Sequence, residues 1–156
     1  MAQLEKDTKA PEFSGENQNG KLISLADFAE KKLILYFYPK DNTPGCTAEA
    51  CNLSDNYDFW IKQGYEVLGV SPDSKESHQK FIAKYALPFD LLSDPNHEIL
   101  AAYGAWGEKN LYGKITVGVI RTTYVINENG LIEEVFKRPK TKEHTEQIAK
   151  KLEISE

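Results

Sequence analysis

An unbroken run of apolar and aromatic residues, LILYFY at residues 33–38, is the strongest constraint on how this chain folds. A strand with one face in water alternates polar and apolar residues, whereas a run with no polar residue has to be covered on both faces. The segment PKDNTPGC follows directly, and its two prolines and one glycine interrupt regular structure. The sequence therefore predicts a central sheet strand that ends in a loop.

A helix is expected to start in this loop, with Thr43 as its N-cap and Pro44 at its first position. Gly64 is the expected C-terminal stop. In between, apolar residues recur at the spacing of one helix face, at Cys46, Ala50, Leu53, Tyr57 and Trp60. Cys46 is thus predicted to lie in the first turn of a helix that follows a buried strand.

The rest of the chain continues the alternation of strands and helices. The pattern predicts a strand at 65–70, a helix opened by Asp73 and Glu76 and ending near Tyr85, a strand at 89–92, a helix at 95–103, a loop through Lys114, a strand at 117–126, a turn at Asn129-Gly130, a paired strand at 131–136 and a helix from Thr141. This order indicates an α/β fold, a thioredoxin-like sandwich with a central mixed sheet flanked by helices. No linker, internal repeat or low-complexity tract divides the chain, so we expect residues 1–156 to form a single domain.

Composition narrows the classes of partner. With 156 residues and 40% hydrophobic content, the chain is long enough to bury a core without disulfides. Its formal net charge is -5 and its basic residues form no long stripe, which argues against a nucleic-acid partner. No stretch reaches the roughly 18 apolar residues of a membrane span, and the start MAQLEKDTKA has no apolar signal-peptide centre. We expect a cytoplasmic protein with no membrane attachment.

The predicted position of Cys46 favours its thiolate form. Free backbone N–H groups and the positive end of the helix dipole stabilise an anion there. The dipole supplies only about 0.3–1 kcal/mol, whereas making a thiolate the main form at neutral pH takes about 3 kcal/mol, so a second positive group is needed. Arg121 is the candidate, because a charge within VGVIRTTYVI calls for an anionic partner. There are two alternatives to this interpretation. Arg121 could lie on a solvated strand face, and Cys46 could be only a small buried hydrophobic residue.

The spacing of the two cysteines, Cys46 and Cys51, indicates a reaction cycle. Residues five apart in an intact α-helix have Cα atoms about 8.6 Å apart, beyond the roughly 7 Å that a disulfide spans. Joining the two cysteines therefore requires the first turns of the helix to unwind. The expected sequence is attack of the Cys46 thiolate on a peroxide, formation of a sulfenic acid, and condensation with Cys51.

Other uses of paired cysteines fit less well. A metal site would show a C-x2-C spacing or nearby histidines, but the histidines are dispersed over separate predicted helices, where a surface position is expected: His78, His97 and His144. A dithiol oxidoreductase would show C-x-x-C after the first strand, and this chain does not. A thiol-bearing binding or chaperone-like module that only senses oxidant is the rival class. Turnover discriminates between them, because a sensor reacts once per molecule.

The segment FYPKDNTPGCTAEAC resembles the active-site segment of the peroxiredoxins, most closely the peroxiredoxin Q or bacterioferritin comigratory protein branch. Similarity continues through SPDSKESHQKF, LSDP, WGEKNLYGK and GVIRTTYVINENG, from about residue 8 to about residue 152. The resemblance implies a thioredoxin-like fold and reduction of hydrogen peroxide and organic hydroperoxides, with Cys46 as the peroxidatic and Cys51 as the resolving cysteine. It also implies that no cofactor or metal is needed and that thioredoxin or a glutaredoxin-like protein is the reductant. Members of this branch differ in where the resolving cysteine lies and in whether they associate; Cys51 is the only other cysteine here, and we expect a monomer or a weak dimer.

By the same resemblance, four further residues belong to the site. Thr43 would place its hydroxyl at the sulfur and the peroxide, and Pro39 would shield and shape the pocket. Arg121 would hold the thiolate and the developing charge, and Glu49 would orient that arginine. Preorganised donors of this kind lower the barrier for a step in which charge builds on a leaving oxygen. Packing roles are expected for the aromatic residues Trp106, Tyr36 and Tyr38.

Overall fold

The computed structural model describes residues 3–154, which contain a seven-stranded sheet and a separate two-stranded hairpin. The strands are β1 (Ser14–Asn17), β2 (Leu22–Ser24), β3 (Lys32–Phe37), β4 (Tyr65–Ser71), β5 (Asp90–Ser93), β6 (Trp106–Leu111), β7 (Lys114–Val119), β8 (Thr122–Ile126) and β9 (Ile132–Phe136). The order in the large sheet is β2-β1-β5-β4-β3-β8-β9. Strand β4 pairs in parallel with β3 and β5, whereas β8 is antiparallel to β3 and β9, so the sheet is mixed, as predicted.

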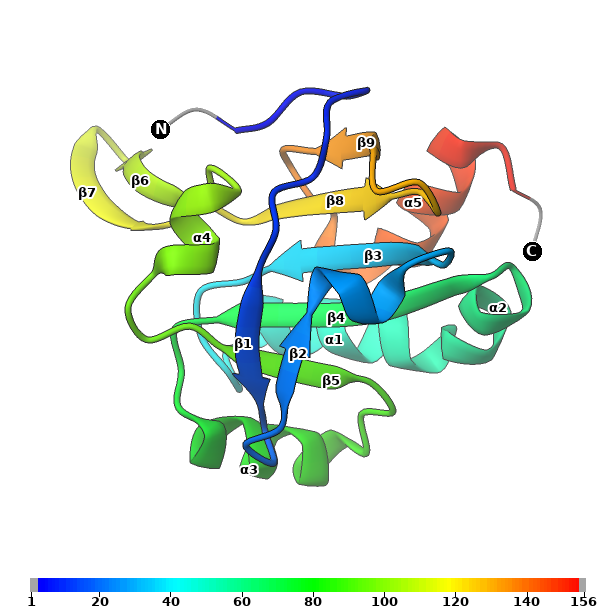
Figure 1. The fold of residues 1–156 in the computed structure, drawn as a ribbon. Coiled ribbons are helices and arrows are strands. Elements are labelled where there is room, and N and C mark those ends of the chain that lie inside the picture. Colours follow the sequence, from blue (N-terminus) through cyan, green and yellow to red (C-terminus); the bar gives the residue numbers. More distant parts are fainter. Residues whose placement is uncertain (1–2, 155–156) are drawn as a thin grey trace.

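The helical segments are α1 (Pro44–Asp55), α2 (Tyr57–Lys62), α3 (Lys75–Tyr85), α4 (Glu98–Ala102) and α5 (His144–Leu152), with short 3-10 turns η1 (Leu25–Phe28) and η2 (Thr141–Glu143). Figure 1 shows the β1–β2 hairpin crossing one face of the sheet, with α1 behind it and α3 below β5. The α4 helix and the β6–β7 hairpin lie together at one end. None of the helices in residues 3–154 has the length and apolar composition that crossing a bilayer requires.

Strand β3 lies between two hydrophobic cores, which confirms that LILYFY is covered on both faces. Because side chains alternate along a strand, Leu33, Leu35 and Phe37 enter one core and Ile34 and Tyr36 enter the other. The first core also takes side chains from the N-terminal segment and α4. The second takes side chains from α1, α2, α3 and α5, and it contains Cys46. Cys46 is therefore packed into one of the two buried cores, on the face of β3 that α1 covers.

The helix predicted from residue 44 is divided at Asn56. Thr43 and Pro44 occupy the predicted N-cap and first positions. At Asn56 the side-chain amide donates to the Asn52 carbonyl at 2.8 Å, a local hydrogen bond of the kind that competes with the helical ladder. The N-cap of α3 is Ser74, which accepts from the Ser77 backbone N–H, so the prediction that Asp73 and Glu76 open this helix was wrong.

The largest difference from the predicted elements is the β6–β7 hairpin, where a loop is predicted. Its two-residue turn, Tyr112-Gly113, has positive φ at both positions, 54° and 81°, which suits a hairpin but lacks the usual Asn-Gly signal. The strand predicted at 117–126 is interrupted between Val119 and Thr122. The helix predicted at 95–103 is confined to α4, and the hairpin of β1 and β2 has no counterpart among the predicted elements.

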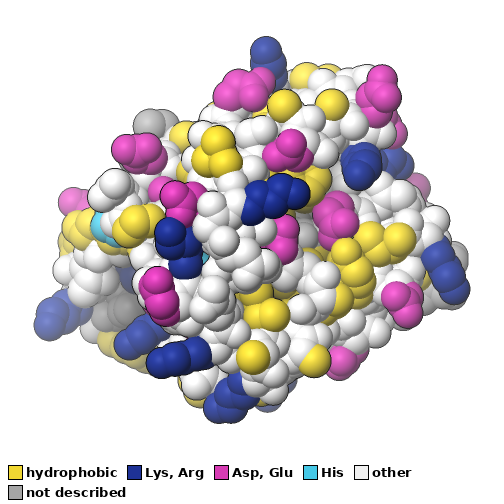
Figure 2. All heavy atoms as spheres, turned by 60° about the horizontal axis from the view of Figure 1, so that its bottom comes forward, with side chains coloured by type: hydrophobic (Ala, Val, Ile, Leu, Met, Phe, Trp, Pro, Cys, Tyr) yellow, Lys and Arg dark blue, Asp and Glu magenta, His cyan; other side chains and the backbone are white. Residues whose placement is uncertain are grey.

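Charged groups of both signs are interspersed over the face shown in Figure 2, and hydrophobic side chains gather in a patch between them. This face shows no extended stripe of lysine and arginine.

Candidate active site

Cys46 lies at the N-terminal end of α1, as the third residue of the helix. The Thr47 N–H donates to the Thr43 carbonyl at 2.8 Å and is the first helical hydrogen bond in this segment. The N–H groups of Gly45 and Cys46 precede it, so they have no partner within the helix and lie at the positive end of its dipole. Cys46 is only 1% exposed, so an anionic sulfur here depends on partners supplied by the protein.

Arg121 supplies the positive group. Its Nη2 donates to the Cys46 Sγ at 3.2 Å, and its Nη1 donates to Glu49 Oε1 at 2.7 Å. Burial opposes the charge on the guanidinium, but Glu49 and Cys46 outweigh it and raise the pKa of Arg121. The residue lies in the interruption between β7 and β8, not inside the continuous strand predicted at 117–126. The predicted meeting of Arg121 and Cys46 is confirmed.

Glu49 lies one turn along α1 from Cys46, and its side chain is fully buried. Burial raises the pKa of Glu49 to about 7, although the charge and hydrogen bond of Arg121 oppose the rise. Its second oxygen, Oε2, has no hydrogen-bond partner within the described residues. Glu49 therefore holds Arg121 in place, but it neutralises the guanidinium only in part at neutral pH.

His144 faces the unpaired oxygen of Glu49 from the start of α5, with 3.6 Å between its Nε2 and Glu49 Oε2. Its Nδ1 lies 2.9 Å from Gln147 Oε1, which also accepts from the Lys140 N–H, so Nδ1 carries the hydrogen and Nε2 is left to accept from the Thr123 hydroxyl at 2.8 Å. Burial lowers the pKa of His144 to about 4. His144 is thus a neutral acceptor beside the Arg121–Glu49 pair.

Thr43 and Pro39 flank the cysteine along the loop between β3 and α1. The Thr43 hydroxyl donates to the Lys40 carbonyl at 2.9 Å, so its hydrogen is directed at the loop and its oxygen is left as an acceptor. The resemblance implies that this hydroxyl lies at the sulfur. In the structure it is instead bonded to the Lys40 carbonyl. Pro39 is partly exposed and follows the buried Tyr38 at the end of β3.

Cys51 lies on the same helix and is partly exposed, and both cysteines are free thiols. Desolvation and the Asp55 carboxylate raise the pKa of Cys51. The two cysteines are therefore in different electrostatic surroundings, with a guanidinium beside Cys46 and a carboxylate near Cys51. Since α1 is continuous from Pro44 to Asp55, the geometry requires it to open before the sulfurs can bond.

Two of the three histidines correct the sequence-based expectation. His78 and His144 are completely buried, whereas His97 is partly exposed and stacks on Trp106 with ring centroids 3.7 Å apart. Helical spacing could have shown this, because His78 shares a face with Phe81 and His144 with Ile148. Gly45 is a further residue of the site that the sequence pattern did not indicate. A Cβ at this position would lie 3.4 Å from Arg121 Nη2.

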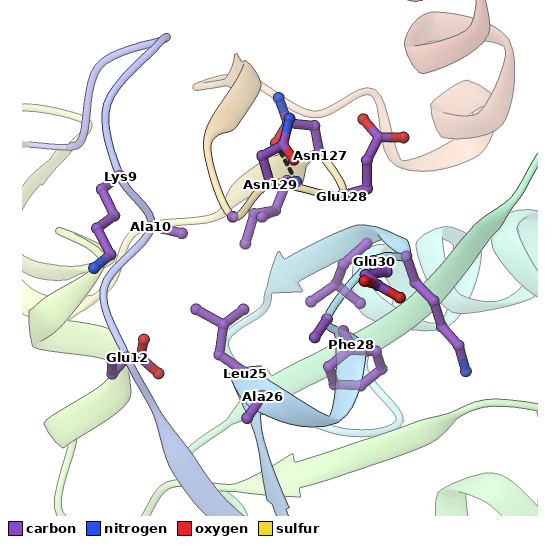
Figure 3. A pocket seen from close by; sticks show the side chains of 15 residues that line it. Lys9, Ala10, Glu12, Leu25, Ala26, Phe28, Glu30, Asn127, Glu128 and Asn129 are labelled. Atoms are coloured by element: carbon purple, nitrogen blue, oxygen red, sulfur yellow. Dashed lines mark hydrogen bonds between the residues drawn. The ribbon is translucent and has the colours of Figure 1, made fainter.

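An apolar pocket of about 260 Å³ lies away from this site, at the other ends of β3 and β8 (Figure 3). Leu25 and Phe28 line one side and Asn127 and Asn129 the other, with Lys9, Glu12, Glu30 and Glu128 also among its residues. None of the site residues described above lines it. Within residues 3–154, no three His, Cys, Asp or Glu side chains are grouped as metal ligands would be.

The family model and the similar sequences indicate the same protein family. The model of the AhpC/TSA family matches residues 7–135. A protein named putative peroxiredoxin bcp from Helicobacter pylori is 44% identical over 152 residues, which cover 97% of this chain and all of the relative. Peroxiredoxin Bcp from Escherichia coli is 44% identical over 135 residues, 86% of either chain.

Solved structures agree with the sequence relatives. Peroxiredoxin Q from Xanthomonas campestris superimposes with a TM-score of 0.84 and 33% identity, over 90% of this chain and 89% of that one. Another structure of the X. campestris protein, there called bacterioferritin comigratory protein, has the same TM-score and identity, and that protein is described as having alkyl peroxide reduction activity. The thioredoxin-like fold predicted from the sequence is confirmed by these neighbours.

Proposed function

We propose that this chain, which belongs to the AhpC/TSA family and is a peroxiredoxin, uses Cys46 as the thiolate that attacks hydroperoxides and Cys51 as the thiol that resolves the product. The comparisons make it a thiol peroxidase, and the roles of individual residues are our assignment. The observation that carries the assignment is the Arg121 guanidinium, 3.2 Å from a buried cysteine sulfur at a helix N-terminus.

In the first step, the Cys46 sulfur attacks the outer oxygen of the O–O bond. The S–O bond forms as the O–O bond breaks, the sulfur is oxidised to a sulfenic acid, and the leaving oxygen departs as water or an alcohol after taking up one proton. Negative charge moves from the sulfur to the leaving oxygen. Groups that already point at the sulfur therefore stabilise the transition state without reorganising.

Arg121 is suited to this task because it holds the thiolate and lies beside the path of the moving charge. Thr43 offers an acceptor oxygen, since its hydrogen is taken by Lys40, so it would receive the O–H of the hydroperoxide. Glu49 orients Arg121 through the 2.7 Å hydrogen bond. Pro39 would limit access of water to the sulfur from the loop side.

In the second step, the sulfur of Cys51 attacks the sulfenic sulfur of Cys46, the S–S bond forms, and the S–O bond breaks with release of water. This step requires α1 to unwind from its N-terminal end. An external dithiol, which we take to be thioredoxin or a glutaredoxin-like protein, then reduces the disulfide and is itself oxidised. We further propose that the chain acts in the cytoplasm as a single-domain monomer or weak dimer, without a bound cofactor.

The test is NADPH oxidation in the presence of thioredoxin, its reductase and hydrogen peroxide or an alkyl hydroperoxide. The wild type should consume many equivalents of peroxide per molecule, Cys46→Ser should be inert, and Cys51→Ser should gain oxygen in its intact mass without forming the intramolecular disulfide. A wild type that consumes a single equivalent despite its reductants would instead be an oxidant sensor. Full turnover by Cys46→Ser would show that the reactive sulfur has been assigned wrongly.

A further inference from the structure

The loop that leads to Cys46 is fastened to α3 through one carboxylate. Asp41 is 7% exposed, and its Oδ1 accepts from the Tyr38 hydroxyl at 2.6 Å. Its Oδ2 accepts from the Ser77 hydroxyl at 2.8 Å and lies 2.7 Å from His78 Nδ1. The Asp41 N–H donates to Asp73 Oδ2 at 2.7 Å. Both the side chain and the backbone of Asp41 are therefore fixed.

The protons of His78 can be assigned from its two partners. Its Nε2 lies 2.9 Å from the Leu92 carbonyl, which can only accept, so Nε2 carries a hydrogen. A neutral ring would then present a bare Nδ1 lone pair to Asp41 at 2.7 Å. A proton must therefore lie between Nδ1 and Oδ2, which makes this contact either a buried imidazolium–carboxylate pair or its carboxylic acid tautomer.

A second contact fastens the same loop to the far end of α3. Asn42 has a positive φ of 61°, and its Oδ1 lies 3.1 Å from the Tyr85 hydroxyl and 3.3 Å from Lys84 Nζ. Thr43 follows as the N-cap of α1. Asp41 and Asn42, which lie just before α1, thus contact both ends of α3. Helix α1 itself has to open during the proposed reaction.

We propose that His78 is a positioning residue for peroxide reduction, acting through Asp41 to fix the loop that presents Thr43 and Cys46; this rests on the function proposed above. The same contact keeps Asp41, just before α1, in a fixed position. When the first turns of the helix unwind to reach Cys51, the movement begins after Asp41, and on reduction the chain returns to one defined position.

The test replaces His78 with Phe, which keeps a ring of similar size and removes both nitrogens. Misplacement of a reacting group by about 1 Å costs about 100-fold, so we expect the kcat/KM for hydrogen peroxide to fall about 10- to 100-fold. Alkylation of Cys46 by iodoacetamide at pH 7 should slow as well. The matched control is Ile82→Ala on the same helix, which removes packing against the second core but no contact of Asp41. It should lower stability and leave both rates within about twofold of wild type.

The outcomes separate the two proposals. Equal rates in His78→Phe and Ile82→Ala, with an active wild type, would overturn the role of His78 and leave the peroxidase assignment intact, whereas an inactive wild type would overturn the latter. If His78→Phe does not fold, Asp41→Ala carries the same test and should show at least the same loss. Asp41→Asn should lose less activity, because its amide group can still donate to a neutral His78 ring, and losses as large as in Asp41→Ala would contradict the assigned contact.

Discussion

Replacing Glu49 with Gln tests whether this buried carboxyl keeps a proton near neutral pH. The folded-state pKa of Glu49 is raised from 4.5 to about 7, chiefly by burial. A raised pKa means that the folded protein holds the proton more tightly than the unfolded chain does. Its contribution to stability is therefore complete below pH 4.5 and is lost as the pH rises through about 7. At about 1.4 kcal/mol per tenfold change in the ionisation constant, the loss is about 3 kcal/mol.

Urea unfolding, followed by tryptophan fluorescence under a reductant at several pH values, measures this contribution as the difference between wild type and Glu49→Gln. Between pH 4.5 and pH 7.5 the wild type should lose about 3 kcal/mol relative to the variant, whose amide cannot ionise. His144 acts in the opposite direction, because its pKa is lowered from 6.5 to about 4 and its contribution is lost as the pH falls through that value. Because both proteins contain His144, subtracting one curve from the other removes the effect of His144. The wild-type curve alone still includes it.

Glu76→Gln is the matched control, because Glu76 is exposed and the substitution removes a carboxyl group from the surface instead of the interior. A Glu49→Gln difference that stays constant across this pH range would refute the reasoning. It would mean that Arg121 keeps Glu49 ionised throughout. In that case less of the guanidinium charge would remain available to the Cys46 sulfur than we infer.

Two further substitutions test the site and the core. Arg121→Met should slow alkylation of Cys46 by iodoacetamide at pH 7 by about 10- to 150-fold, because a hydrogen bond to a charged group contributes about 1.5–3 kcal/mol; an unchanged rate would show that the guanidinium does not stabilise the thiolate. Gly69→Ala should lower the free energy of unfolding by about 1–3 kcal/mol, since the new Cβ would lie 2.7 Å from a Leu91 methyl group. Gly107→Ala, where the nearest atom is 3.6 Å away, should cost less, and equal losses would refute the overpacking argument.

The sequence predicted the parts of the fold that depend on strong local patterns. The apolar run that forms β3 and the Thr43-Pro44 helix start are both where the spacing and the cap residues place them. The β6–β7 hairpin was missed because its turn uses Tyr112 in a left-handed conformation, for which the residue type gives little signal. Element boundaries that depend on one side-chain hydrogen bond, as at Asn56, also escape pattern analysis.

The site was predictable only where charge stood out from its surroundings. Arg121 interrupts an apolar segment, so its contact with Cys46 could be inferred, and the partnership of Glu49 came from the family resemblance. The burial of His78 and His144 could have been inferred from their helical spacing to Phe81 and Ile148, but their hydrogen-bond partners could not, because these come from other elements of the fold. His78 is satisfied by Asp41 and by the carbonyl of Leu92, which is distant in sequence.

Hydrogen exchange of the oxidised protein tests most directly the claim that Cys46 is the peroxidatic sulfur of a helix that must open. One equivalent of hydrogen peroxide should give a wild type with an intramolecular disulfide by mass, loss of amide protection over residues 44–53, and unchanged protection in α3. Cys51→Ser treated in the same way should keep its protection, because a sulfenic acid alone does not require unwinding. A disulfide-linked wild type with residues 44–53 still fully protected would contradict the account.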